Sequence, residues 1–361
     1  MKYIIILLMS FIFTHCAHSQ GKSTNKDLFH PTDKNIQYIG RIEFSDPMHP
    51  VFTYPGIQIR TGFTGTSLDI MCKIRSGYFM AEIDGGEPFK ISFLGNTIVN
   101  LARNLEDGTH QAVITYIGEG YETLPEFHGF FVDKGKTLAP ATNVPKRKIE
   151  FIGNSITCGY GIEANSEAEH YEDKTANFYY TYAARTARNL DAQAVVVARS
   201  GIGVYRSYNG PKTGDKVTMN TEYPNTLLYN DKYKWDFSRY TPDLVCINLG
   251  TNDTSTQGSD SLLLLNGFKQ LYRQVRSHYP KAKIVLLCGC MMNGKQLRSA
   301  QQAMDVTVDD AHKQGDAEVY RFDFTPHDGS LGYGADWHPS MRQHEKMANE
   351  LTPFLKKLMN W

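Results

Sequence analysis

The sequence predicts an α/β protein made of an antiparallel β-sandwich of jelly-roll type over residues 30–140 and a three-layer α/β/α domain over residues 146–361. Short β-rich runs without a helical stripe fill the first part, which is typical of an all-β sandwich. In the second part, continuous apolar runs alternate with helical patterns, which indicates a parallel sheet covered on both faces. A segment rich in proline and small residues, 138–147, separates the two parts.

The first residues of the chain predict export. Lys2 precedes an apolar run, 4–13, that is too short to span a bilayer, as in a secretory signal peptide. Ala17-His18-Ser19 has the small-x-small form of a cleavage site, so we expect residues 1–19 to be removed. A lipid anchor at Cys16 is the alternative, although the residue before it is not small. In both cases the protein is expected in the periplasm, at the cell surface or outside the cell.

Composition narrows the function classes. Lys+Arg and Asp+Glu both number 38 among 361 residues, so no net field favours nucleic acid or an anionic membrane. Aromatic residues make up 12% of the chain, which argues against disorder and supplies rings for a core or for stacking on sugars. The five cysteines besides Cys16 have spacings that predict neither a disulfide scaffold nor a zinc site. We expect no metal and no cofactor.

The N-terminal part contains runs in which polar and apolar residues alternate, as in half-buried strands. We expect strands at 37–44, 57–63, 67–74, 78–84, 89–94, 110–117 and 127–133. The polar segment before them, 20–26, reads as a tether. The sandwich is either a carbohydrate binder or a buttress whose loops shape the neighbouring active site. Because its strands show no platform for a sugar, the buttress is favoured.

In the C-terminal part, strands are expected at 149–153, 192–198, 243–249, 282–288 and 318–323, and helices at 175–190, 260–278, 296–314 and 340–357. Three long loops follow strands at one edge of the sheet: 162–174, 205–240 and 325–339. Long loops in compact domains are usually functional or disordered. Because these loops are rich in Tyr, Trp, Asn and Gly, they favour recognition of a polyol.

Ser155 follows the first of these strands, where the sheet hands over to a helix and where ligands of α/β sheets bind. Gly-Asn-Ser is also common turn chemistry, so the context has to decide between a turn and a nucleophile. A serine esterase needs a base, a group that orients the base, and donors for an oxyanion. His338 provides the imidazole and Asp336 a carboxylate. The Ser155 N–H, the Gly201 N–H and the Asn252 side-chain amide provide the donors.

These residues lie in four blocks that together resemble the SGNH (GDSL-like) hydrolase superfamily. The blocks are Gly-Asn-Ser at 153–155, Ser-Gly-Ile-Gly at 200–203, Gly-Thr-Asn-Asp at 250–253, and Asp-Trp-His-Pro at 336–339. The residues of these blocks are most similar to those of carbohydrate esterase family 2, in which a β-sandwich precedes the SGNH domain. The resemblance implies a serine esterase that deacetylates xylan and glucomannan through an acetyl-enzyme, with a liking for the 6-position of hexoses.

Two other functions stay open. The first is an esterase of the same superfamily acting on another acetylated glycan, such as peptidoglycan, or on a lipid. The second is a carbohydrate-binding protein with a vestigial hydrolase domain. Trp337, Tyr205 and Trp235 are the candidates for stacking on sugar rings, although packing in the core or in a loop explains Trp235 nearly as well. The expected partner is therefore an acetylated polysaccharide or oligosaccharide.

The chain departs from the superfamily pattern at the acid. The usual carboxylate lies three residues before the histidine, where this chain has Ala335, and Asp336 is only two residues before His338. Either Asp336 or a backbone carbonyl therefore orients the imidazole, and the length of the loop favours Asp336. His327 and His344 are weaker candidates for the base than His338, which stands at a loop-to-helix junction.

Overall fold

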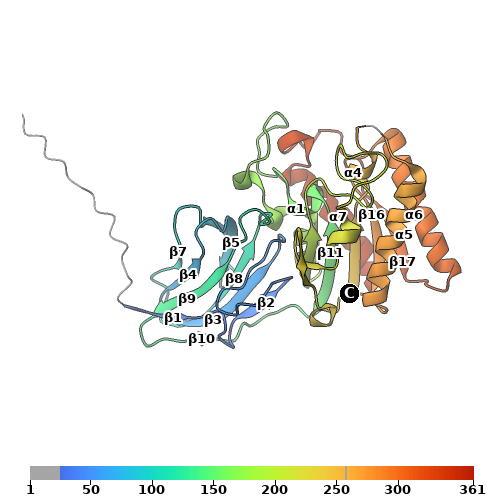
Figure 1. Cartoon of the computed structure of the whole chain (residues 1–361). Coiled ribbons are helices and arrows are strands. Elements are labelled where there is room, and N and C mark those ends of the chain that lie inside the picture. Colours follow the sequence, from blue (N-terminus) through green and yellow to red (C-terminus); the bar gives the residue numbers. More distant parts are fainter. Residues whose placement is uncertain (1–24, 257) are drawn as a thin grey trace, which may run out of the picture.

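In the computed structural model, residues 25–256 and 258–361 are described, and they form a β-sandwich beside an α/β domain (Figure 1). The predicted signal peptide and Cys16 lie outside the described residues. No helix in the described ranges is long and apolar enough to cross a membrane. The predicted fold class is confirmed, because an antiparallel N-terminal part is followed by a parallel five-stranded sheet with helices on both faces.

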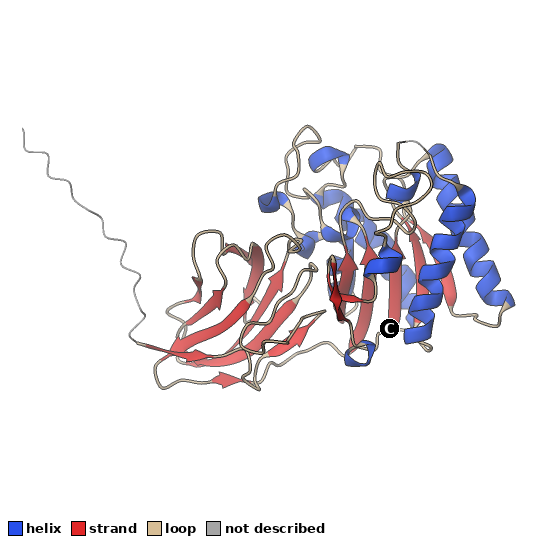
Figure 2. Cartoon of the chain, in the orientation of Figure 1, coloured by secondary structure: helices blue, strands red, loops and turns tan. Residues whose placement is uncertain are grey.

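The sandwich consists of two antiparallel sheets packed around one apolar core (Figure 2). One sheet has the order β1-β9-β4-β7, with β1 (Lys26–Phe29), β9 (Phe127–Asp133), β4 (Leu68–Cys72) and β7 (Ile98–Ala102). The other has the order β10-β3-β8-β5-β6, with β10 (Leu138–Ala139), β3 (Gln58–Gly65), β8 (Gly108–Tyr116), β5 (Tyr78–Ile83) and β6 (Phe89–Ser92). Strand β2 (Gln37–Ile39) pairs with β3.

The C-terminal sheet is parallel throughout, in the order β12-β11-β15-β16-β17. Its strands are β11 (Arg147–Gly153), β12 (Ala192–Ala198), β15 (Leu244–Asn248), β16 (Lys283–Cys288) and β17 (Val319–Asp323). Helices α2 (Tyr182–Asn189) and α7 (Met341–Met359) cover one face, and α5 (Ser261–His278) and α6 (Gly294–Lys313) cover the other. Strand β11 lies inside the sheet, between β12 and β15.

Shorter elements lie in the connections. They are the α-helices α1 (Ser155–Cys158), α3 (Met219–Glu222) and α4 (Thr251–Thr254), the hairpin β13 (Asn225–Leu227) with β14 (Asn230–Lys234), and the 3-10 turns η1 (Asp173–Thr175), η2 (Phe178–Tyr180), η3 (Phe237–Arg239) and η4 (Ala335–Trp337).

Several boundaries differ from the sequence prediction. Strand β1 includes the end of the segment read as a tether, and β7 was not predicted. The helix expected at 175–190 begins only at Tyr182, because Thr181 caps it and accepts the Ala184 N–H at 3.3 Å. The residues before the cap form η1 and η2. The loop expected at 205–240 contains α3 and the β13–β14 hairpin.

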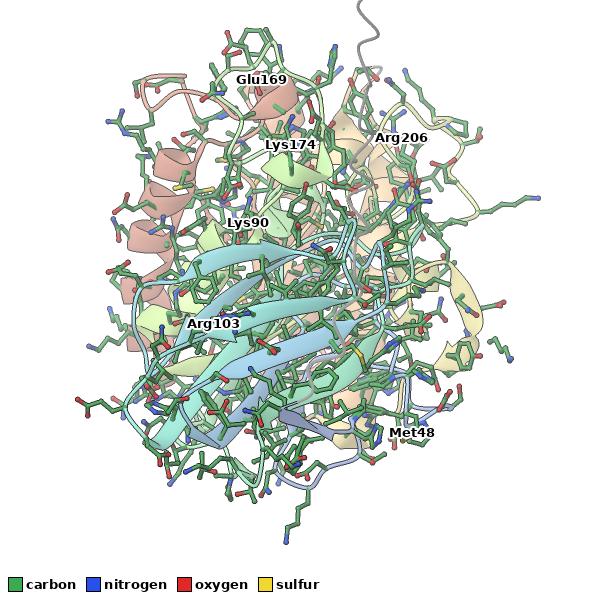
Figure 3. The ribbon with its side chains drawn as sticks, turned by 90° about the vertical axis from the view of Figure 1, so that its left-hand side faces the viewer. Met48, Lys90, Arg103, Glu169, Lys174 and Arg206 are labelled. Atoms are coloured by element: carbon green, nitrogen blue, oxygen red, sulfur yellow. The ribbon has the colours of Figure 1, made fainter. Side chains whose placement is uncertain are left out.

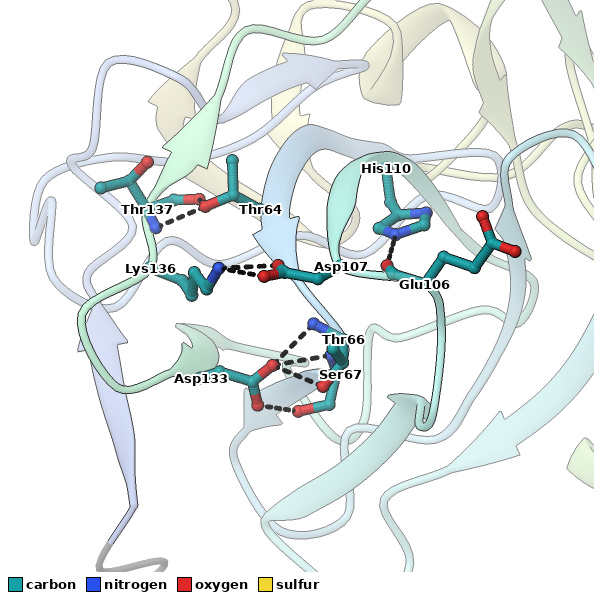
Figure 4. Close-up of polar contacts among 9 residues, drawn as sticks. All are labelled: Thr64, Thr66, Ser67, Glu106, Asp107, His110, Asp133, Lys136 and Thr137. Carbon is teal, nitrogen blue, oxygen red and sulfur yellow. Dashed lines mark hydrogen bonds and ion pairs between the residues drawn. The ribbon is translucent and has the colours of Figure 1, made fainter.

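Within the sandwich, Asp133 at the end of β9 ties down the turn between β3 and β4 (Figure 4). Its carboxylate accepts the Thr66 N–H at 2.7 Å and the Ser67 N–H at 3.1 Å, together with both hydroxyls. These bonds outweigh burial and lower the pKa of Asp133 to about 2. The two sheets are therefore joined by polar contacts as well as by their common core.

The two domains share a buried ion pair. Arg41, from the sandwich, and Glu150, from β11, are both fully buried, with Nη2 and Oε1 at 3.0 Å. Arg41 also donates to the carbonyls of Tyr223 and Asn225, and the Tyr223 hydroxyl donates to Glu150 at 2.8 Å. Trp235 packs beside this pair with its ring 5.3 Å from the guanidinium carbon, so it belongs to the interface.

Because both charges are removed from water, loss of one partner leaves the other buried and unpaired. Arg41→Ala is expected to lower the free energy of unfolding by about 3–5 kcal/mol. Urea denaturation followed by circular dichroism measures this change. The matched control is Lys136→Ala, which breaks the exposed pair with Asp107 in Figure 4 and should cost less than about 1 kcal/mol. Equal effects of the two substitutions would contradict the assigned role of Arg41.

Candidate active site

Ser155 is the first residue of α1, directly after β11, as the sequence predicts. Asn154 caps this helix, and its side-chain oxygen accepts the Ile156 N–H at 3.1 Å. Asn154 therefore has a structural role here. The Ser155 side chain lines a cavity at the carboxyl edge of the sheet.

His338 lies against Ser155, with its Nε2 2.9 Å from the Ser155 Oγ. Its Nδ1 is 3.0 Å from the backbone carbonyl of Ala335. Because a carbonyl can only accept, Nδ1 carries the ring proton, and Nε2 is left to accept the hydroxyl proton. The Tyr160 ring is stacked on the imidazole, with centroids 4.1 Å apart and an angle of 24° between the planes.

The structure does not place Asp336 on the imidazole. Its Oδ1 is 2.8 Å from the His170 Nδ1, and its Oδ2 accepts the Tyr160 hydroxyl at 2.8 Å and the Tyr171 N–H at 3.2 Å. Although burial opposes its ionisation, these bonds lower the pKa of the carboxyl. The favoured pairing of Asp336 with His338 is thus corrected to a contact between His338 and the Ala335 carbonyl.

The cause of this difference lies in the backbone around residues 335–338. Asp336 and Trp337 have φ of +49° and +64°, a left-handed region that non-glycine residues seldom adopt. This conformation turns the Asp336 side chain toward the 162–174 loop and the Ala335 carbonyl toward the imidazole. Gly161 permits the close approach of Ala335, because a Cβ there would lie 2.3 Å from the Ala335 Cβ. A larger residue at 335 has no room.

The predicted oxyanion donors line the same cavity as Ser155. Asn252 lies in α4, and one N–H of its Nδ2 forms a hydrogen bond with the Ile202 carbonyl at 2.8 Å. The second N–H is left for a ligand. Gly201 has φ of +79°, a conformation that favours glycine. In the part of the chain that the structure describes, neither the Ser155 N–H nor the Gly201 N–H donates to an acceptor.

The cavity has a volume of about 550 Å³ and aromatic residues at its mouth. Trp337 lines it with 58% of its surface exposed, as expected for a residue that stacks on a sugar. Tyr205 does not line it: the residue is buried, and its hydroxyl accepts the Asp260 N–H at 3.1 Å. Tyr208 is exposed and takes that place in the wall. The assignment of Tyr205 as a substrate-binding residue is wrong for that reason.

The alternative bases are placed away from the hydroxyl of Ser155. His344 is buried in α7, and its Nδ1 accepts the Tyr182 N–H at 3.2 Å. His327 packs edge-on against Tyr333, and it does not line the cavity. Cys158, three residues after Ser155, is the alternative nucleophile in the sequence. Burial raises the pKa of its thiol well above the usual value, so this cysteine stays protonated.

Comparison with known proteins gives the family. Residues 38–141 match the family model "Carbohydrate esterase 2 N-terminal", and residues 151–346 match the "GDSL-like Lipase/Acylhydrolase family". The second match covers more than half of the chain. This chain belongs to carbohydrate esterase family 2. It is accordingly an enzyme, a carboxylic ester hydrolase.

Two curated relatives show how far the likeness extends. A protein named "Cellulase/esterase CelE", from Acetivibrio thermocellus, is 40% identical over 331 residues, which are 90% of this chain and 40% of that protein. This esterase therefore spans less than half the length of that relative. An "Acetylxylan esterase / glucomannan deacetylase" from Cellvibrio japonicus is 30% identical, over 99% of this chain and 98% of the relative.

Solved structures of the family have the same architecture. The family 2 esterase from Clostridium thermocellum, described in complex with cellohexaose, aligns with a TM-score of 0.83 at 39% identity, covering 90% of this chain and 99% of that one. The family 2 esterase from Cellvibrio japonicus aligns with the same TM-score at 28% identity, covering 93% and 98% of the two chains.

Several residues of this family 2 esterase site were not predicted from the sequence. Tyr160 stacks on the base, Tyr208 lines the cavity, and Glu119 of the sandwich binds Ser200. Tyr160 follows the nucleophile block at 153–155, so its position five residues after Ser155 was an available signal. Glu119 had none, because it lies in the other domain.

The environment of His338 gives a pH prediction. Burial lowers the pKa of its imidazole to about 4, against the opposing effect of the Ala335 carbonyl. A base must be neutral, so activity is lost only as the pH falls through this low value. We expect the acid limb of kcat/KM to lie near pH 4, measured with the folded state checked by circular dichroism. A limb near 6.5, the ordinary value for histidine, would contradict the burial argument.

Proposed function

We propose that this esterase removes O-acetyl groups from cell-wall polysaccharides such as xylan and glucomannan, through an acetyl-enzyme on Ser155. The observation that carries the proposal is the 2.9 Å contact between the His338 Nε2 and the Ser155 Oγ. The same cavity holds N–H groups that donate to no acceptor among the described residues. The Cellvibrio japonicus relative, named for activity on both polysaccharides, supports the substrate class. The relative described with cellohexaose supports a glycan chain as the ligand.

The geometry supports a reaction in two halves. Ser155 Oγ attacks the acetyl carbonyl while its proton passes to the His338 Nε2, and the Ala335 carbonyl steadies the Nδ1–H of the resulting imidazolium. The Ser155 N–H, the Gly201 N–H and the Asn252 Nδ2 donate to the oxyanion. As the carbon–oxygen bond to the sugar breaks, His338 returns the proton to the sugar oxygen. Water, deprotonated by His338, then attacks the acetyl carbonyl. The bond between the acetyl group and the Ser155 Oγ breaks, His338 returns the proton to this oxygen, and acetate leaves.

The two rival functions differ in chemistry. A lipase requires a wholly apolar groove for a long acyl chain, whereas this cavity combines aromatic residues with polar groups such as Ser200, Asn252 and Gln296. A binding protein without turnover has no need of a base in contact with a hydroxyl. Trp337 and Tyr208 are proposed to stack on the sugar that carries the acetyl group.

Acetate release from acetylated xylan, glucomannan and peptidoglycan tests the proposal directly. Release from the two plant polysaccharides, at rates well above that from peptidoglycan, is the expected result. Turnover of p-nitrophenyl acetate, measured beside the panel, separates an esterase from a binding protein. Absence of turnover above buffer on every substrate would overturn the proposal.

Asn252 is expected to act on the rate of reaction more than on binding. As one oxyanion donor among three, its loss in Asn252→Ala should raise the barrier by about 2.7–4 kcal/mol, which lowers kcat about 10²–10³-fold. Steady-state kinetics on p-nitrophenyl acetate measures kcat and KM separately. If only KM changed, Asn252 would bind substrate and transition state equally and would not be an oxyanion donor.

Export is proposed from the sequence alone. The run 4–13 and the Ala17-His18-Ser19 site support a secreted or periplasmic protein, with a lipid anchor at Cys16 as the alternative. Mass spectrometry of the mature N-terminus distinguishes a start near Gln20 from a lipid-modified Cys16.

A further inference from the structure

A loop of the sandwich, residues 117–126, reaches the active site of the catalytic domain. It connects β8 to β9, and its Ile117 is buried in the apolar core beneath α2 and α7. The Phe178 N–H donates to the Ile117 carbonyl at 3.1 Å, and the Gly120 N–H donates to the Thr53 carbonyl at 2.9 Å. The loop is therefore held by both domains.

A second contact holds the two domains together near the site. Lys90, on β6, forms an ion pair with Glu163 and donates to the Lys174 carbonyl at 3.0 Å. Figure 3 shows Lys90 and Lys174 on the two sides of this contact. Glu163 in turn accepts a hydrogen bond from the Asn177 Nδ2 at 2.7 Å. The sandwich thus contacts the active-site loops at more than one point, and its orientation is set close to the site.

Glu119, in the middle of the 117–126 loop, binds Ser200. The Ser200 N–H donates to the Oε2 of Glu119 at 2.7 Å, and the Ser200 hydroxyl donates to Oε1. The pKa of the Glu119 carboxyl is raised, because the effect of burial exceeds the opposing effects of the Ser200 donors and the nearby Arg199. A side chain of the N-terminal domain therefore binds Ser200, the residue directly before Gly201.

Ser200 lies in a turn, and the peptide between the two central residues of this turn carries the Gly201 N–H. The Ile202 N–H donates to the Arg199 carbonyl at 3.3 Å, and Gly201 has φ of +79°, as in a type II turn. Type I and type II turns differ mainly by a flip of the peptide between the two central residues, here Ser200 and Gly201. The direction of the Gly201 N–H therefore depends on how Ser200 is held.

We infer that Glu119 is a positioning residue for the esterase reaction, which holds Ser200 so that the Gly201 N–H stays directed at the oxyanion formed on Ser155. The inference rests on the proposed function, in which Gly201 is an oxyanion donor. Its consequence is that the sandwich completes the active site and is more than a separate binding module. Arg199 lies close enough to Glu119 to lower the pKa of its carboxyl, so its positive charge offsets part of the negative charge of Glu119 beside the developing oxyanion.

The experiment compares Glu119→Ala and Glu119→Gln in the full chain, with p-nitrophenyl acetate as substrate. Glu119→Ala should lower kcat about 10–100-fold with KM within about twofold, because a misplaced donor weakens only the transition state. Glu119→Gln should restore most of kcat, since its amide oxygen can accept the Ser200 N–H and its nitrogen can donate to the Ser200 hydroxyl.

Glu126→Ala is the matched control, because Glu126 ends the same loop and binds Lys73 and His128 of the sandwich. Its kcat is expected to equal that of the wild type. Ser200→Ala keeps the backbone bond to Glu119 and should lower kcat several-fold. If Glu119→Ala fails to fold, Ser200→Ala decides instead, and a wild-type kcat in that variant overturns the inference.

Two results in the folded variants would overturn this inference and leave the proposed function intact. One is a kcat for Glu119→Ala that matches Glu126→Ala, and the other is a Glu119→Gln variant as slow as Glu119→Ala. In both cases wild-type turnover and the loss in Asn252→Ala would be as predicted. If the proposed function itself fails, the wild type shows no turnover, or Asn252→Ala leaves kcat unchanged, which is a distinguishable outcome.

Discussion

Ser155→Ala is expected to fold like the wild type and to lose nearly all turnover. Ser155 supplies the atom that carries the acetyl group in the proposed reaction, so without it the covalent route disappears. In serine hydrolases, removal of the nucleophile lowers kcat about 10⁶-fold, and what remains comes from binding and from the oxyanion donors. Because the Ser155 N–H stays in Ser155→Ala, the oxyanion site is preserved.

The measurement is the initial rate of acetate release from acetylated xylan, beside a wild-type sample purified in the same way. Thermal unfolding midpoints within a few degrees of each other establish that both proteins are folded. Cys158→Ser is a useful companion, since it removes the thiol of α1, and it should keep most of the activity. Wild-type turnover in Ser155→Ala would refute the assigned nucleophile.

The fold was largely predictable because its strands have strong local patterns. Ala192–Ala198 is an apolar run interrupted only by Gln193, at the edge of the parallel sheet, and Phe127–Asp133 is bounded by clear turn residues, so both predicted ranges equal the observed ones. Ile98–Ala102 was missed, because an Asn interrupts its short apolar pattern. The helix after residue 175 was placed too early, since its spacing does not reveal the cap at Thr181.

The site was predictable where a residue acts through its type and its place at the end of a strand. Ser155, Gly201, Asn252 and His338 line one cavity, as the order of the blocks implies. Contacts that depend on backbone direction could not be predicted from the sequence. Sequence spacing does not show which of two nearby tyrosines faces the cavity, nor that the Ala335 carbonyl meets the imidazole.

How His338 is held separates a dyad from a triad, and two substitutions test it. His338→Ala is expected to be inactive, with a loss of about 10⁶-fold in kcat, because the base and the later acid disappear together. Asp336→Asn is expected to keep a tenth or more of the wild-type kcat. The Ala335 carbonyl already selects the tautomer of the imidazole, and the asparagine oxygen can still accept the Tyr160 hydroxyl.

Asp336→Asn is a better test than Asp336→Ala, because asparagine tolerates the left-handed backbone at this position. Asp336→Ala would also release His170 and Tyr171, so part of its effect would come from the 162–174 loop. In a serine protease triad, the same change of Asp to Asn lowers kcat about 10⁴-fold, through the wrong tautomer of the histidine. A loss of that size in this esterase would restore Asp336 as the acid of a triad.

The pH profile of Asp336→Asn adds a readout that a damaged loop would not produce. The carboxylate of Asp336 raises the pKa of His338, although burial has the larger and opposite effect. Removal of this charge should therefore move the acid limb of kcat/KM to lower pH, while the rate on the plateau stays within tenfold of the wild type. A plateau reduced by several orders of magnitude would show that Asp336 acts on the imidazole directly and that the carbonyl alone does not orient His338. A limb that moved to higher pH would contradict the assigned effect of the Asp336 charge on the pKa of His338.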